Sequence, residues 1–195
     1  MKLDRGDICG LIDALCLSED IKGTDIPAMD LYMDQLITFL NGKLQSSKRE
    51  ANDKIFTKTM VNNYTKDELL VPPKNKKYNK EHVMLLILMY HLKNVLTIQD
   101  IKRLFQPVLR DMSTTEDDII SLETIYDIYL ELKKNQLDEF SSHFPEKWEY
   151  IRQKTLDIEN ADNREMADLF LTVMVLIAQA NAAKRLAEKI IDRYF

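Results

Sequence analysis

The sequence predicts an all-α protein, and three observations support this fold class. Glycine (4 residues) and proline (5 residues) are scarce among the 195 residues, which argues against a many-turned β architecture. Leu, Ile, Lys, Glu and Met are plentiful instead, a mixture that favours helices. Apolar residues also recur at near-helical spacing in several segments. With 45% apolar residues, the chain has enough material for one large domain or two small ones.

The first half of the chain predicts four helices. We expect a short amphipathic helix within residues 1–20, a linker at 21–27 and a second helix over 29–44 that ends near Gly42. Thr57 is a suitable N-cap for a third, short helix that runs to about residue 68 and is stopped by two prolines at 72 and 73. Asn79 can cap a strongly apolar fourth helix.

The second half predicts longer helices. Thr97 and Asp100 form a capping box, with Asp in place of the usual Glu or Gln, for a helix that stops before Pro107. A capping box at residues 113–116 opens a helix of about twenty residues, and Pro145 suits the first position of a further helix. The last helix begins at residues 162–165 and ends near 193. Because residues 169–178 are apolar on every face, we expect them to be buried on all sides.

Several functional classes lack their usual signals. The two cysteines lie seven residues apart and form no CxxC pair, which indicates a reduced intracellular chain. The charged N-terminus is not typical of a signal peptide, and the longest uncharged run (169–183) is shorter than the ~20 residues that cross a bilayer. We therefore expect a cytoplasmic protein with no membrane partner.

The sequence also predicts no enzyme. The three histidines (His82, His91 and His143) are scattered, and none pairs with a cysteine at metal-binding spacing. The acidic run at residues 116–118 suits the first turn of a helix, where carboxylates favour the dipole. No phosphate-cradling glycine loop and no nucleophile motif is present. We expect no catalytic residues, no metal and no cofactor.

Charge is unevenly distributed along the chain. The net charge is −5, yet residues 43–82 contain ten lysines and arginines against five aspartates and glutamates, a local net charge of +5. A basic segment in an acidic protein is typical of a localised anion-binding face. A solvated charged surface is the alternative.

The short segment FTKTMVNNYTK, residues 56–66, has an unusual polar pattern. Thr59, Asn62, Asn63 and Lys66 fall at i, i+3, i+4 and i+7, which is one face of a helix. Met60, Val61 and Tyr64 fall on the opposite face. Asparagine can bond both adenine N6 and N7, threonine can contact a thymine methyl, and lysine can pair with phosphate or guanine. The pattern therefore fits a helix that reads a DNA major groove, unless the amides merely face solvent.

The residues that follow resemble the MerR-type winged helix-turn-helix. The resemblance covers residues 29–110 and depends on a tyrosine-ended recognition helix, a Leu-Leu-x-Pro turn, a short basic wing with a tyrosine, and a second pair of helices; the matching residues are 60–64, Leu69, Leu70, Pro72, Tyr78 and 98–104. The family's paired arginines are replaced by Asn62, Lys74, Lys76 and Lys77.

The resemblance implies how the DNA-contacting roles divide. Three residues would contact base edges: Thr59, Asn62 and Asn63. Five lysines would hold phosphates and make binding salt-dependent: Lys58, Lys66, Lys74, Lys76 and Lys77. The whole chain also resembles a bacterial family catalogued as a domain of unknown function, most clearly in the segments MDLYMDQ, KTMVNNYTK, LLVPPKNKKY and ANAAKRLAEKIIDRYF.

These inferences predict a three-part chain. Residues 1–28 form a helical extension and linker, residues 29–110 a MerR-like winged helix-turn-helix domain, and residues 111–195 a helical bundle with a long C-terminal helix. We expect a transcriptional regulator that binds double-stranded DNA as a homodimer through the C-terminal part, which is also where a small-molecule effector would bind. The alternative is a helical interaction or scaffold protein that keeps the winged-helix fold without binding DNA. Met166, Phe170, Met174 and Tyr194 fit a plain core helix, with a cavity or partner groove as the other interpretation.

Overall fold

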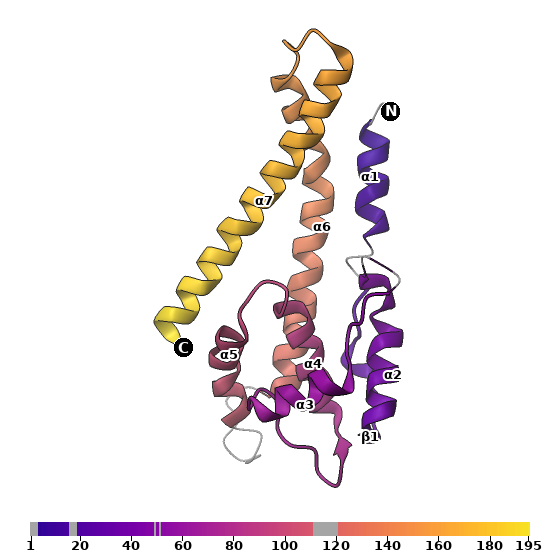
Figure 1. The fold of residues 1–195 in the computed structure, drawn as a ribbon, viewed down its shortest axis with the longest axis vertical. Helices are drawn as coiled ribbons and strands as arrows, with labels where there is room; N and C mark the ends of the chain where they lie inside the picture. The colour runs from indigo at the N-terminus through magenta and orange to yellow at the C-terminus, as the bar shows by residue number, and fades with distance from the viewer. Residues whose placement is uncertain (1–3, 16–18, 49, 51, 111–120) are drawn as a thin grey trace. The chain divides into compact units, whose positions relative to one another are not determined.

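The computed structural model describes residues 4–15, 19–48, 50, 52–110 and 121–195 (Figure 1). The chain divides into two compact units. Unit 1 consists of Met1–Ser18 and Lys133–Ala187, and unit 2 of Glu19–Leu132 and Glu188–Phe195. Two long helices, α6 (Leu122–Lys154) and α7 (Ala161–Tyr194), therefore contribute to both units. The sequence-based division at residues 28 and 110 stays a prediction.

Unit 2 is mainly helical with one small sheet (Figure 1). Its described elements are, in order, η1 (Gly23–Asp25), β1 (Leu31–Tyr32), α2 (Met33–Lys43), η2 (Gln45–Ser47), α3 (Lys58–Lys66), β2 (Lys77–Tyr78), α4 (Lys80–Leu92) and α5 (Ile98–Arg110). β1 and β2 pair antiparallel, with Leu31 opposite Tyr78 and Tyr32 opposite Lys77. The mainly helical prediction is confirmed in the described residues.

The core of unit 2 is built around α4. Eight consecutive residues of this helix, from His82 to Met89, are buried, and they pack with apolar side chains of α2, α3, α5 and the first turns of α6. Tyr126 of α6 is fully buried and donates its hydroxyl to the carbonyl of Ile21 at 2.6 Å. Because that burial disfavours the phenolate, it raises the pKa of Tyr126. The helix that the sequence marks as most apolar is therefore central.

Most predicted helix starts are confirmed. Thr57 caps α3 and Asn79 caps α4, each by accepting a bond from a backbone N–H three residues on. Thr97 accepts from the N–H of Asp100 at the start of α5. One start differs: Leu31–Tyr32 is a strand, and α2 begins at Met33, where Gln35 accepts from the N–H of Tyr32. The capping box predicted at residues 113–116 and the acidic run at 116–118 lie outside the described residues.

Both predicted proline boundaries are wrong. Pro107 lies inside α5, which continues to Arg110, and Pro145 lies inside the single helix α6 rather than at the start of a new one. An internal proline removes one helical hydrogen bond and costs about 3 kcal/mol. Around Pro145 that cost is offset by packing, because Pro145 is buried and Phe144 and Trp148 beside it are core residues. Tertiary packing overrides the local signal there.

Unit 1 combines α1 (Arg5–Ala14) with parts of α6 and α7. Asp4 and Asp7 form a reciprocal capping box at the start of α1. The apolar core of this unit is small and consists of Ile8, Ile12, Phe144 and Trp148, with Phe140 and Leu176 packed against it. A core of this size leaves much of the stabilisation to other contacts.

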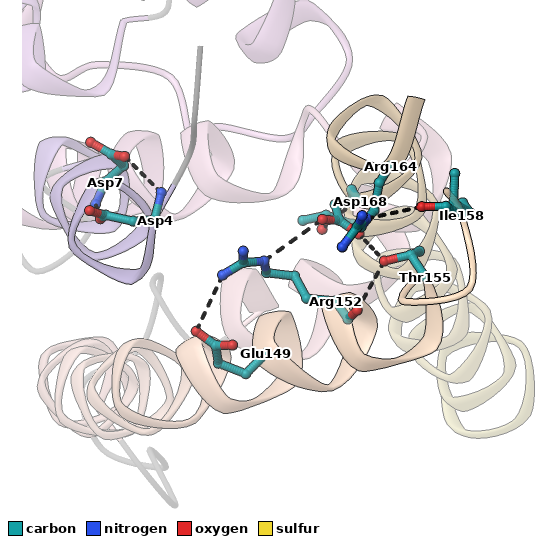
Figure 2. A network of polar contacts seen from close by, with 9 residues as sticks. Asp4, Asp7, Glu149, Arg152, Thr155, Ile158, Arg164 and Asp168 are labelled. Carbon is teal, nitrogen blue, oxygen red and sulfur yellow. Dashed lines mark hydrogen bonds and ion pairs between the residues drawn. The ribbon is translucent and has the colours of Figure 1, made fainter. Parts of the chain in front are cut away.

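A polar network ties α6 to α7 within unit 1 (Figure 2). Asp168 of α7 is buried, and its carboxylate lies 3.7 Å from Nε of Arg152 of α6. The Thr155 hydroxyl donates to the same carboxylate at 2.5 Å and lies 3.0 Å from the Arg152 carbonyl. The Arg152 guanidinium also stacks over the Trp148 ring, 4.8 Å from its centroid. A buried carboxylate needs this pairing because an unpaired charge in a core is costly.

The apolar segment of α7 is exposed, so the expectation that it is buried on all sides is wrong. Asp168 and Thr172 face inward, while the outward side consists of Met166, Phe170, Leu171, Val173, Met174, Val175 and Ile177. An 18-residue window of α7 has a mean hydropathy of 1.6, so by length and composition alone this helix is able to cross a bilayer; 11% of that window is buried. Within its own unit α7 thus buries polar residues and exposes apolar ones.

The pairing of Arg152 with Asp168 should contribute measurably to stability. Replacing Arg152 by Gln leaves the buried carboxylate with Thr155 as its side-chain partner, and we expect the free energy of unfolding to fall by about 2 kcal/mol. Lys154→Gln is the matched control, because Lys154 lies over the exposed Tyr150 ring and should change stability by less than about 0.5 kcal/mol. Urea unfolding of both variants measures the difference. Equal effects would show that the network does not stabilise the α6–α7 pair.

Candidate nucleic-acid interface

Both ends of α3 are fixed by local hydrogen bonds. At its start the Thr57 hydroxyl accepts from the N–H of Met60 at 3.2 Å. At its end the N–H of Leu69 bonds the carbonyl of Tyr64 at 2.8 Å and the N–H of Glu68 bonds that of Thr65 at 3.2 Å. These two bonds, together with a φ of 59° at Glu68, are a Schellman cap. The helix therefore ends before the prolines that were expected to stop it.

The orientation of α3 follows its apolar side. Val61 and Tyr64 are buried in the core of unit 2, and Met60 packs partly against it. The opposite side, formed by Thr59, Asn62, Asn63 and Lys66, is exposed. The predicted division of the helix into an apolar back and a polar front is therefore present in the structure. Whether the front contacts bases stays a prediction.

The segment that leads into α3 is held by two side chains. The Asn41 amide of α2 donates to the carbonyl of Phe56 and accepts from its N–H, both at 3.0 Å. Lys93, beyond the end of α4, donates to the carbonyl of Ile55 at 2.8 Å, and its ammonium lies 5.1 Å from the ring centroids of both Phe56 and Tyr90. Sequence reasoning missed both residues, because a contact between segments far apart in sequence leaves no local pattern.

A tight hairpin turn presents the basic residues between α3 and α4. The N–H of Lys77 bonds the carbonyl of Lys74 at 3.0 Å, and both intervening residues have positive φ, 53° at Asn75 and 62° at Lys76. This is the geometry of a type I′ turn. Asparagine tolerates that conformation, whereas lysine rarely adopts it. The turn leads into β2, so the β1–β2 pair joins it to the start of α2.

The five predicted phosphate-binding lysines have different surroundings. Lys66, Lys74 and Lys76 are exposed. Lys77 is half-buried, with its ammonium 5.2 Å from the centroid of the Tyr32 ring. Lys58 is exposed but forms an ion pair with Asp34 at the start of α2. Lys66, Lys74 and Lys76 present their charge directly to solvent, whereas a phosphate would have to compete with Asp34 for Lys58.

Acidic groups also lie at the C-terminal end of α3. Asp67 and Glu68 are exposed, and the Glu68 carboxylate pairs with Lys102 of α5 at 2.8 Å. The hydrogen bond and the positive charge of Lys102 lower the pKa of Glu68, so this carboxylate stays ionised. Negative charge therefore lies beside Lys66 at this end of the helix, where Glu68 is already paired with Lys102.

His82 connects the turn region to the core. Its Nε2 lies 3.0 Å from the carbonyl of Val71, and its Nδ1 accepts from the N–H of Asn79 at 3.2 Å. The ring also makes an edge contact with Tyr78, the residue that pairs with β1. Burial lowers the pKa of His82, with the Val71 bond and nearby Glu81 and Asp30 opposing that shift. A neutral imidazole therefore fixes the chain on both sides of the hairpin.

The other histidines do not form a site. His91 lies in unit 2 within 3.9 Å of Asp20, and His143 lies in unit 1 against the carbonyl of Glu139. In the part of the chain that the structure describes, no group of three or more His, Cys, Asp or Glu side chains is arranged to hold a metal ion.

The matched region decides the family. Residues 21–129 match the family described as Domain of unknown function (DUF1836). The matched region contains 109 of the 195 residues. The chain belongs to this family. No curated protein and no solved structure matches it.

The DUF1836 match contains the whole candidate interface. It extends from the segment before β1, through α2, α3, the hairpin turn, α4 and α5, to Tyr129 in the first turns of α6. The resemblance to a domain-of-unknown-function family is thereby confirmed over residues 21–129, and the closing segment at 180–195 lies outside the match. The DUF1836 match does not bear on the resemblance to MerR-type proteins.

The role of His82 predicts a pH-dependent stability. Because its pKa is lowered on folding from the ordinary 6.5, the unfolded chain takes up a proton below about pH 6.5 that the folded chain does not. The free energy of unfolding should therefore fall as the pH drops from about 7.5 to about 5.5, and His82→Gln should flatten that dependence. Thermal unfolding across this range measures it. His143→Gln, on an exposed imidazole, should follow the wild type. An unchanged slope in His82→Gln would contradict the assignment.

Proposed function

We propose that this protein is a DNA-binding transcriptional regulator that reads the major groove with α3 and holds phosphates with the basic turn at residues 74–77. The observation that carries the proposal is the exposed front of α3. Thr59, Asn62 and Asn63 lie together on it, backed by buried Val61 and Tyr64. Amide and hydroxyl groups on one helical face are suited to base edges. Thr59, Asn62 and Asn63 would contact bases.

The order of the elements supports a MerR-like winged helix-turn-helix in residues 29–110. A short strand, two helices, a hairpin turn, a second strand paired with the first, and two further helices follow one another as β1, α2, α3, the 74–77 turn, β2, α4 and α5. In such an arrangement the second helix enters the groove while the turn contacts the backbone. Exposed Lys66, Lys74 and Lys76 would bind phosphates, with Lys58 and Lys77 contributing through their weaker, already engaged charges.

The interface of a single copy is small and the whole chain is acidic, so we propose that two copies bind together. The outward side of α7 is suited to pair them. Met166, Phe170, Val173 and Ile177 follow spacings of four, three and four residues, which keeps apolar side chains along one seam of a paired helix. With Met174 they expose on the order of 500 Å² of apolar surface, so two copies would bury about 1,000 Å² in total, the lower end for a specific interface.

A second copy covers this surface better than a bilayer. On the same turns of α7, the buried Asp168 is paired with Arg152 of α6. The part of α6 that belongs to unit 1 also carries many charged residues. Inserting α7 into lipid would break that pair or bring Arg152 into the hydrocarbon, and either change costs several kcal/mol. A protein surface can cover the apolar side and leave the pair intact.

The second candidate is an interaction protein with the same fold and no DNA contact. Two observations favour it: the ion pair of Lys58 with Asp34, and the exposed acidic pair Asp67–Glu68 at the end of α3. Both reduce the positive potential at the proposed groove contact.

The division of roles on α3 and the turn is directly testable. Asn62→Ala or Asn63→Ala should remove the preference for one sequence among fragments from the gene's own upstream region, with little change in binding to random duplex. Lys76→Ala should weaken binding to every duplex and lower the slope of log affinity against log salt by about one unit. Gel shifts at two ionic strengths measure both. Lys134→Ala, an exposed lysine in unit 1, is the charge control. No binding to any fragment at low salt would favour the interaction protein.

The pairing of two copies is tested separately. The double variant Phe170→Glu/Met174→Glu places two charges on the outward side of α7, and we expect it to sediment as a monomer where the wild type sediments at twice the chain mass. Leu11→Glu/Leu156→Glu, which charges two exposed leucines elsewhere in unit 1, should remain dimeric. Sedimentation equilibrium distinguishes these states. A wild type that is monomeric at micromolar concentration, or a wild type that partitions onto neutral lipid vesicles, would contradict the proposed pairing.

A further inference from the structure

A pocket of about 270 Å³ lies in unit 2 beside the segment that leads into α3. Its wall combines the chain just after α2 with the last turn of α4 and the residues beyond it, and its lining residues are Ser47, Lys48, Asp53, Lys54, Ile55, Tyr90, Lys93 and Asn94. Three lysines and one aspartate give the lining a net charge of +2. The lining is therefore polar and positive, unlike the apolar lining typical of pockets for drug-like ligands.

The charged groups of this pocket are not paired with one another. The Asp53 carboxylate accepts from the N–H of Glu50 at 3.0 Å, and Lys93 donates to a neutral acceptor, the carbonyl of Ile55, at 2.8 Å. None of the ion pairs between described residues involves Lys48, Lys54 or Lys93. Lys93 is half-buried, and burial lowers the pKa of its ammonium. An anion in the pocket would restore the solvation that this ammonium has lost.

We infer that this pocket binds a phosphate group through Lys48, Lys54 and Lys93, with the Tyr90 hydroxyl and the Asn94 amide at its edge. Three ammonium donors around a half-open cavity of this size suit a compact anion better than a large organic ligand. Two kinds of ligand carry such a phosphate group: a free phosphorylated small molecule, and the backbone of a DNA bound by the same unit.

The pocket lies next to the residues that orient α3. Ile55, whose carbonyl Lys93 binds, directly precedes Phe56, whose backbone is paired with Asn41, and Thr57 then caps α3. A phosphate bound by Lys93 would therefore compete with the carbonyl of Ile55 and alter the segment that leads into α3. The consequence for DNA binding rests on the proposed function; the pocket itself does not.

The first experiment titrates the full-length protein with inorganic phosphate at constant ionic strength and follows backbone amide chemical shifts. We expect saturable changes confined to residues 47–55 and 90–94. Lys48→Gln/Lys54→Gln should weaken binding about tenfold or more, because two of the three cations are lost. Lys43→Gln/Lys134→Gln removes the same charge from exposed positions outside the pocket and should leave the affinity within about twofold. Unsaturated changes spread over all lysines, or equal effects of both double variants, would overturn the inference.

Lys93 needs its own variant because it also supports the fold. Lys93→Arg keeps the charge and a donor for Ile55, and its thermal midpoint shows whether it is folded. In the folded variant we expect phosphate binding to persist with changed affinity, whereas binding identical to wild type would remove Lys93 from the site. This readout separates loss of the ligand from loss of structure.

A second arm distinguishes the two sources of phosphate. With a duplex of about 20 base pairs, inorganic phosphate and DNA compete for the pocket if its natural occupant is a backbone phosphate, whereas both bind at once if the occupant is a free molecule. Either result supports the pocket. If no duplex binds at all, the proposed function fails while the phosphate titration still stands or falls on its own result.

Discussion

The candidate interface depends on one pair of hydrogen bonds, those between the side-chain amide of Asn41 and the backbone of Phe56. They join α2 to the segment that leads into α3, one residue before the cap of that helix. Phe56 is then fully buried, so the chain can enter α3 only in the direction that buries Val61 and Tyr64. With that direction fixed, the 3.6-residue period turns Thr59, Asn62 and Asn63 to solvent. The polar side of α3 is exposed because Val61 and Tyr64 on the opposite side are buried.

Unit 1 distributes its polar and apolar groups in the opposite way. α7 buries Asp168 and Thr172 and exposes its largest apolar side chains, because the inward position is filled by an ion pair and a hydroxyl rather than by methyl groups. Removing one partner of such a pair leaves the other buried and unpaired, which is why Arg152→Gln is expected to be destabilising. In the proposed dimer the exposed apolar side of α7 would be covered by a second copy while this pair stays intact.

The sequence predicts the helices well and their interruptions poorly. Caps at Thr57, Asn79 and Thr97 are local chemistry, readable from three or four neighbouring residues, and all are present. Pro145 misleads because it is buried beside core residues, whose packing can offset the lost hydrogen bond, whereas Pro107 lies exposed within α5 and has no such explanation. The exposed face of α3 could be predicted from periodicity alone. The roles of Asn41 and Lys93 could not be predicted, because each side chain contacts a residue more than ten positions away in the sequence. The exposure of α7 could not be predicted either, because hydrophobicity indicates that a surface will be covered without indicating by which chain.

Sequence preference and affinity would reside in different parts of unit 2. The front of α3 is mostly neutral, with Lys66 as its one cation, and the exposed Asp67 and the Lys102-paired Glu68 follow at its C-terminal end. Positive charge is concentrated instead on the 74–77 turn and around the pocket of Lys48, Lys54 and Lys93, on either side of that helix in the sequence. Under the proposed function, cations on the turn would attract any duplex equally, whereas Thr59, Asn62 and Asn63 on α3 would carry the sequence preference. If both proposals hold, an anion bound at the entry to α3 would change the contacts of that helix and leave the charge of the 74–77 turn unchanged.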